Sequence, residues 1–243
     1  MNEQDDFDVA RSIQRVTRDR YSAWQFIQGF TETWQALLLS GDGNDEEQIA
    51  FAELRLGVRL PAALREAYEL LGRRTDLTSN QDRLLQPEAL RLDPSGEVLV
   101  FRLENQNNAR WGIRLKESTQ DDPPVLFENL AGRGGGWRPW LPTTSLAIVE
   151  IILSETMFGR GVEVTDNAPL DADSAALVER SYRHMDFPEY PAWTDPDGLG
   201  VRWFYGSKAV LREDSREWLW VLALRPADLA EVKAALPLDW LGG

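Results

Sequence analysis

The chain has 243 residues, of which 43% are hydrophobic and ten are Trp, and its net charge is −14 at pH 7. It contains no Cys, which excludes disulfides, thiolate nucleophiles and Cys-ligated zinc or iron–sulfur sites. A chain of this length forms one large domain or two small ones, and it can bury a core without metal or disulfide staples.

The negative charge is concentrated at the two ends of the sequence. Residues 1–48 carry ten acidic and four basic side chains, a net −6, and residues 160–243 carry fifteen and nine, also −6. Residues 49–159 carry fifteen and thirteen, a net −2. Such a chain should not bind nucleic acid, because phosphates need a basic surface. A basic protein is its natural counterpart, although solubility alone would explain the acidity equally well.

No targeting segment is predicted. Residues 1–8 are acidic and lack the apolar core of a signal peptide. The best apolar run, residues 148–153, is interrupted by Glu150 and is far shorter than the roughly 18 residues of a membrane span. We therefore expect a cytoplasmic protein.

Helical periodicity dominates the first part of the chain. Apolar residues recur with helical spacing from Ala23 to Leu38, which predicts an amphipathic helix, and a weaker helix is expected around residues 13–16. A second helix is predicted from Asp45, its N-cap, to Leu56, with Gly57 closing it in the left-handed conformation. Pro61 is suited to begin a third helix, which ends at Gly72.

Strands are expected after Pro94, where the periodicity changes. Three predicted strands, at residues 98–103, 111–115 and 125–127, should be adjacent in one sheet, with Trp111 buried. Thr143 or Thr144 then caps a helix to Phe158 whose narrow polar strip is Glu150, Ser154 and Glu155. Beyond it we expect a helix at residues 173–184, strands at 201–205, 208–211 and 218–224, and a last helix from Pro226.

Catalytic motifs are weak throughout. The single histidine, His184, is on a predicted helix, where a surface or packing role is expected. The run from Asp42 to Glu47 lacks the ligand order of a calcium loop, and the glycines of residues 132–136 lack the Lys-Ser/Thr of a phosphate-binding loop. Asp121 and Asp122 precede two prolines and are interpreted as a turn. We predict no catalytic residue, no metal site and no cofactor.

Four segments together resemble the SUKH superfamily, the Smi/Knr-like domain of bacterial immunity proteins and fungal cell-wall regulators. They are residues 52–61 with Leu64 and Tyr68, similar to the family's E-x-x-LG-x-x-LP-x-x-L helix pair; residues 98–113; the Asp-Pro-Pro-Val-Leu of residues 122–126; and the helix of residues 146–158. The resemblance covers residues 46–158, and Leu126 departs from the family's aromatic residue.

The resemblance implies an α+β fold in which a mixed or antiparallel sheet packs against helices. The expected organisation is a helical extension over residues 1–45, a SUKH-like core over 46–160, and a strand–helix extension over 161–243 packed on the same unit. It also implies a protein-binding role without catalysis. Many family members are immunity proteins that neutralise a toxin by binding it, and nuclease toxins are often basic.

Three functions therefore stay open: an immunity-type inhibitor, a scaffold or regulatory module that binds a cellular protein, and a carboxylate- and metal-dependent enzyme. The first is preferred, with a basic toxin domain as partner and no membrane contact. Eight acidic side chains are the candidate contact residues: Asp42, Asp45, Glu46, Glu47, Asp195, Asp197, Glu213 and Asp214. A helix cap or solvated turns would explain the same residues without a partner.

Overall fold

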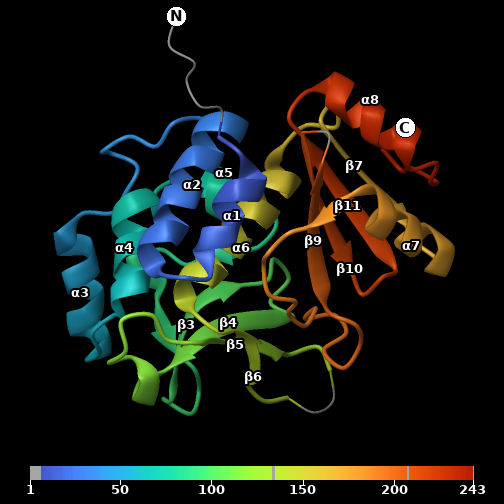
Figure 1. Cartoon of the computed structure of the whole chain (residues 1–243). Helices are drawn as coiled ribbons and strands as arrows, with labels where there is room; N and C mark the ends of the chain where they lie inside the picture. The colour runs from blue at the N-terminus through green and yellow to red at the C-terminus, as the bar shows by residue number, and fades with distance from the viewer. Residues whose placement is uncertain (1–6, 133–134, 207, 243) are drawn as a thin grey trace, which may run out of the picture. The chain divides into compact units, whose positions relative to one another are not determined.

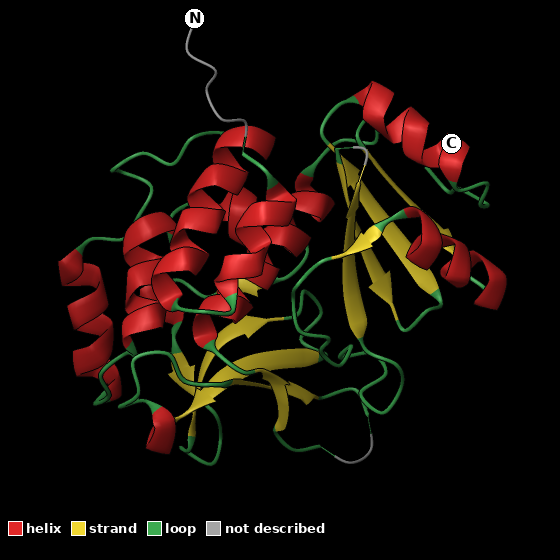
Figure 2. Ribbon diagram, in the orientation of Figure 1, coloured by secondary structure: helices red, strands yellow, loops and turns green. Residues whose placement is uncertain are grey.

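The computed structural model of the chain describes residues 7–132, 135–206 and 208–242. It divides into two compact units, each with its own sheet. The first unit comprises residues 19–156, and the second comprises residues 1–18 and 157–243. All strand pairs in the described residues are antiparallel and helices accompany both sheets (Figure 2), which confirms the predicted α+β class.

The sheet of the first unit has the strand order β1-β3-β4-β5-β6, and β2 pairs with β3 beside β1. Its strands are β1 (Arg83–Leu84), β2 (Arg91–Leu92), β3 (Val98–Leu103), β4 (Ala109–Arg114), β5 (Val125–Asn129) and β6 (Arg138–Leu141). Its helices are α2 (Arg20–Trp34), α3 (Glu46–Leu56), α4 (Ala62–Leu71), α5 (Thr75–Thr78) and α6 (Thr144–Gly159), the last of which crosses the boundary between the units. Figure 1 shows α4 and α6 on one side of this sheet.

The central strands of this sheet are the three that hydrophobic alternation predicts, and their adjacency is confirmed. Trp111 on β4 lies opposite Phe127 on β5 and Arg102 on β3. Its side chain is only 2% exposed, as expected for the face that packs on the helices. Every residue of β3 is buried, including Arg102, whose partners are described below.

Local capping chemistry determines where the helices begin and end. Asp45 is the N-cap of α3, where its backbone N–H donates to Oε1 of Gln48 at 3.2 Å, and Gly57 ends the helix with φ 68°. Both features were predicted. The predicted helix over residues 23–38 is too long, because α2 ends at Trp34 and Gln35 leaves helical geometry. Asp122 is more than a turn residue, since its carboxylate accepts bonds from N and Oγ of Ser145 and caps α6.

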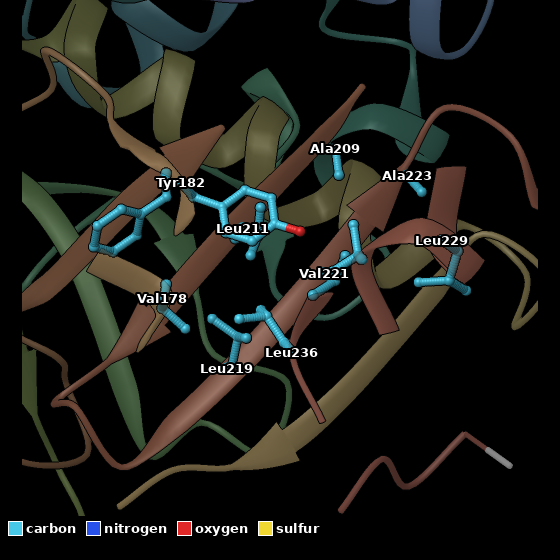
Figure 3. Close-up of a cluster of buried hydrophobic side chains, with 11 residues drawn as sticks. Val178, Tyr182, Ala209, Leu211, Leu219, Val221, Ala223, Leu229 and Leu236 are labelled. Atoms are coloured by element: carbon cyan, nitrogen blue, oxygen red, sulfur yellow. The ribbon is translucent and has the colours of Figure 1, made fainter. Parts of the chain in front are cut away.

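The sheet of the second unit has the order β7-β11-β10-β9-β8. The strands are β7 (Thr165–Pro169), β8 (Arg183–His184), β9 (Val201–Gly206), β10 (Ala209–Asp214) and β11 (Trp218–Ala223), and the helices are α1 (Val9–Val16), α7 (Ala172–Ser181) and α8 (Pro226–Ala235). Figure 3 shows the core of this unit, in which Val178 of α7, Leu229 of α8 and Leu236, directly after α8, pack on the sheet residues Leu211, Leu219 and Val221.

The observed organisation differs from the expected one in three respects. The expected helical arm of residues 1–45 is divided, since α1 groups with the second unit and α2 with the first. Residues 157–243 build a separate sheet and core instead of extending the first. His184 is not helical, because α7 ends at Ser181 and His184 pairs with Phe204 as part of β8.

Candidate functional site

An irregular loop between β8 and β9, residues 186–200, contains a concentration of acidic side chains. Asp186, Glu189, Asp195 and Asp197 are all exposed, and the segment contains no Lys or Arg. We call residues 186–200 the acidic loop. Two of its members, Asp195 and Asp197, belong to the predicted contact residues, whereas Asp186 and Glu189 were not predicted. The sequence signal that identifies them is a stretch of fifteen residues with four acids and no Lys or Arg.

The acidic loop is held at several points, which fixes its backbone. Tyr190 N donates to O of Val201 at 3.4 Å, and the buried Trp203 Nε1 donates to the Tyr190 hydroxyl at 3.1 Å. Near the other end, Gly200 N donates to Oε1 of Glu189 at 3.1 Å, and Ser215 Oγ donates to O of Leu199 at 2.7 Å. A segment that is ordered before binding loses less conformational entropy when a partner docks.

The other two predicted residues of the second unit, Glu213 and Asp214, accept hydrogen bonds from neighbouring side chains. Glu213 is completely buried, and both of its carboxylate oxygens accept from Nη2 of Arg202, at 2.9 and 2.7 Å. It therefore cannot be a surface contact, and that part of the prediction is wrong. Burial raises the pKa of Glu213, although Arg202 opposes the change. Asp214 accepts from Nε of Arg212 at 2.8 Å and from Nε1 of Trp220 at 3.2 Å.

The four predicted residues of the first unit lie at the start of α3, and arginines neutralise most of them. Asp42 pairs with Arg74 at 3.1 Å, Asp45 with Arg73 at 2.8 Å, and Glu46 with Arg65 at 2.5 Å. Only the fourth, Glu47, makes no side-chain hydrogen bond or ion pair within the described residues. This segment is consequently much less acidic on its surface than its sequence suggests.

The outward face of α3 is apolar. Its buried face is formed by Ile49 and Ala52, and helical spacing places Phe51 and Leu54 on the opposite side, where they are 60% and 81% exposed. We call Glu47, Ala50, Phe51 and Leu54 the α3 ridge. The sequence contains the signal for this feature, because residues 51 and 54 lie off the face that residues 49 and 52 define.

A group of buried charges lies between β3 and α6 in the first unit. The guanidinium of Arg102 contacts Glu150 at 3.1 Å, Glu155 at 2.8 Å and Asp82 at 3.5 Å, and its Cζ lies 4.7 Å from the centre of the Trp111 ring. Glu155 also accepts backbone N–H bonds from residues 80, 81 and 82. Two residues of the polar strip predicted on α6, Glu150 and Glu155, therefore form ion pairs with the buried Arg102.

This buried group carries three carboxylates against one arginine. Burial raises the pKa of Asp82 to about 6; the attraction of Arg102 opposes the rise, and the nearby Glu155 and Glu150 add to it. A raised carboxyl pKa is also found at catalytic sites. Here the side chains of Arg102, Glu150 and Glu155 are at most 3% exposed, so the group lies in the interior of the unit, where no substrate reaches it.

The surface of the first unit is hollowed beside the turn that joins α3 to α4. This open hollow of about 690 Å³ lies between residues 57–62 and residues 115–121. Arg65 reaches its wall, where its guanidinium binds Glu53 at 2.8 Å. The two acidic side chains of the described wall, Glu53 and Asp121, each pair with an arginine.

The lone histidine makes a packing contact, and the glycine-rich segment is described only in part. His184 is exposed and lies edge-on to the ring of Phe204, with centroids 5.3 Å apart. Two residues of the glycine-rich segment, 133 and 134, lie outside the described part of the chain. Within the described ranges, no three His, Cys, Asp or Glu side chains are grouped to hold a metal ion, and no helix has the length and apolarity needed to cross a membrane.

Comparisons of the chain with protein-family models, with curated proteins and with solved structures find no match. The resemblance to the SUKH superfamily therefore stays a prediction that depends on the four segments quoted above.

Proposed function

We propose that this chain is a non-catalytic, cytoplasmic protein-binding module that neutralises a basic toxin domain by direct contact. The observation that carries the proposal is the acidic loop, whose four acidic side chains are exposed, whose own sequence contains no Lys or Arg, and whose backbone is held by β9. The SUKH-like segments of the first unit support an immunity role, and the net charge of −14 supports a basic partner.

The physical advantage of the acidic loop is the rate of encounter. An inhibitor must reach its toxin before damage is done, and opposite charges raise association rates from roughly 10⁵–10⁶ to roughly 10⁸–10⁹ M⁻¹s⁻¹ at low salt. The enzyme hypothesis is less well supported. Among the residues that the structure describes, the two carboxylates whose pKa is raised by burial, Asp82 and Glu213, lie inside their units and pair with arginines.

The test is co-expression with the product of the adjacent reading frame in the native genome. We expect the chain to rescue cells from that product and the double variant Asp195→Asn/Asp197→Asn to associate with it more slowly. A matched control, Glu163→Gln/Asp173→Asn, removes the same charge from exposed positions elsewhere in the second unit. Equal slowing by both variants would show that total charge matters and the acidic loop does not.

A scaffold or regulatory module is the second candidate. The acidic loop would then bind a basic cellular protein, and the adjacent gene would encode no toxin. Failure of rescue, together with stable capture of a basic host protein that the loop variant loses, would favour this function.

A further inference from the structure

The α3 ridge combines exposed apolar side chains with charges that change sign along the helix. Phe51 and Leu54 are both exposed and lie on the side of α3 opposite its buried face of Ile49 and Ala52. Exposed apolar surface is costly, at roughly 25 cal/mol per Å². Two large apolar side chains at neighbouring positions of one helix face therefore gain free energy when a partner covers them.

The charges at the two ends of the α3 ridge have opposite signs. Glu47 stands at the N-terminal end, and Arg59 follows the C-terminal end, just beyond Gly57. Both side chains are exposed, and neither makes a hydrogen bond or an ion pair within the described residues. Arg55 adds a second exposed cation near that end, although its Nη2 donates to the carbonyls of Pro87 and Leu90.

We propose that the α3 ridge is a self-association surface on which a second copy of this chain packs antiparallel about a two-fold axis. Setting Phe51 of one copy against Leu54 of the other brings the N-terminal end of α3 in each copy, with Glu47, opposite the segment that follows α3 in its partner, with Arg59. Both ends then meet opposite charge, while the apolar middle is covered from both sides. An isologous contact of this kind requires a self-complementary surface.

This charge pattern selects a second copy over the basic partner of the proposed function. A uniformly basic surface would match Glu47 but would face Arg55 and Arg59 with like charge, which disfavours binding. The inference does not rest on the proposed function, because the acidic loop belongs to the other unit. Either can fail without the other.

The contact is small, so the dimer should be reversible. A helix of eleven residues is about 16 Å long, which covers much less than the roughly 800 Å² per partner of a standard interface. We therefore expect dissociation constants of roughly 10⁻⁵ to 10⁻³ M, near the weak end of specific association. Sedimentation equilibrium over that concentration range measures it directly.

Charge-swap variants test the antiparallel arrangement. Glu47→Arg and Arg59→Glu should each weaken self-association about tenfold, because each places like charges at both ends of the pair. An equimolar mixture of the two variants should recover wild-type association, since every end then meets its opposite. Leu54→Asp should abolish the dimer, whereas Leu241→Asp, at an exposed apolar position of the second unit, should not.

The outcomes separate the possibilities. A chain that stays monomeric up to millimolar concentration overturns the proposal, as does a dimer that survives Leu54→Asp. Failure of the mixture to recover association overturns the antiparallel pairing of Glu47 with Arg59. All substituted side chains are exposed, so far-UV circular dichroism and thermal melting should match wild type and confirm that each variant is folded.

Discussion

Replacement of Asp82 by Asn should stabilise the protein at neutral pH. Asp82 is buried beside Arg102 with Glu150 and Glu155, and burial raises its pKa from 3.8 to about 6. Each pKa unit corresponds to about 1.4 kcal/mol, so ionising this group costs about 3 kcal/mol more in the folded protein than in the unfolded chain. Asn resembles the protonated carboxyl and avoids that cost, while Glu150 and Glu155 still hold Arg102.

The sign of the pH dependence follows from proton binding. Between about pH 4 and pH 6 the folded state holds a proton on Asp82 that the unfolded chain has lost, so wild-type stability from this group falls as pH rises. Below pH 4 both states are protonated and the two proteins should be equally stable. Above about pH 6.5 the advantage of Asp82→Asn should level off at up to about 3 kcal/mol.

Urea denaturation at a series of pH values between 4 and 8 measures this difference, because urea adds no ionic screening. Subtracting the wild-type curve removes the titrating groups that lie away from Asp82, since the two proteins share them. Glu97→Gln, an exposed acid of the same unit, is the control and should give a flat difference. A variant that is less stable than wild type at pH 8 would refute the reasoning, because attraction to Arg102 would then outweigh burial.

Four further predictions concern stability and metals. Arg102→Leu leaves three buried carboxylates without a counter-charge and should cost about 3–5 kcal/mol by urea titration at pH 7, less at pH 5. Trp111→Ala opens a cavity beside Arg102 and should cost roughly 3–5 kcal/mol, with an unchanged denaturation midpoint as the contrary result. Tyr190→Phe leaves the buried Nε1 of Trp203 without its acceptor and should cost about 1–3 kcal/mol while raising hydrogen exchange in the acidic loop. Zn²⁺, Mn²⁺ and Mg²⁺ should leave the melting temperature unchanged, and a sub-micromolar metal affinity would revive the enzyme hypothesis.

Hydrophobic periodicity predicted the elements whose residues face a core on one side. The sequence of α3 contains both its cap, Asp45, and its terminator, Gly57, and both act as expected. The adjacency of β3, β4 and β5 follows from alternation together with short connections. These features depend on residues close together in the chain, which is why a single sequence reveals them.

Elements that depend on distant partners were not predictable. β7 has the sequence Thr-Asp-Asn-Ala-Pro, which has low strand propensity, and it forms by pairing with β11. In the turn between β10 and β11, Ser215 and Arg216 both have positive φ. Asn-Gly is the usual sequence of such a turn, so Ser-Arg did not indicate a hairpin. Two-residue strands such as β8 give no periodic signal at all.

The candidate site was predicted in part. Asp195 and Asp197 are exposed as expected, but the sequence could not show that Glu213 is buried by Arg202, eleven residues earlier on the neighbouring strand. Nor could it show that arginines 19 to 32 residues away neutralise Asp42, Asp45 and Glu46. Ion pairs between residues of different helices and strands decide which acidic side chains are free to bind a partner. A single sequence does not show which residues form these pairs.

We propose that the acidic loop steers a basic protein partner to this chain. Its most direct test is the association rate with the purified product of the adjacent gene, measured by stopped flow at about 0.1 M and about 1 M salt, where the screening length falls from about 10 to about 3 Å. We predict that the association rate falls steeply with salt, that dissociation changes little, and that Asp195→Asn/Asp197→Asn reduces the salt dependence more than Glu163→Gln/Asp173→Asn. An association rate that is the same at both salt concentrations would contradict the claim.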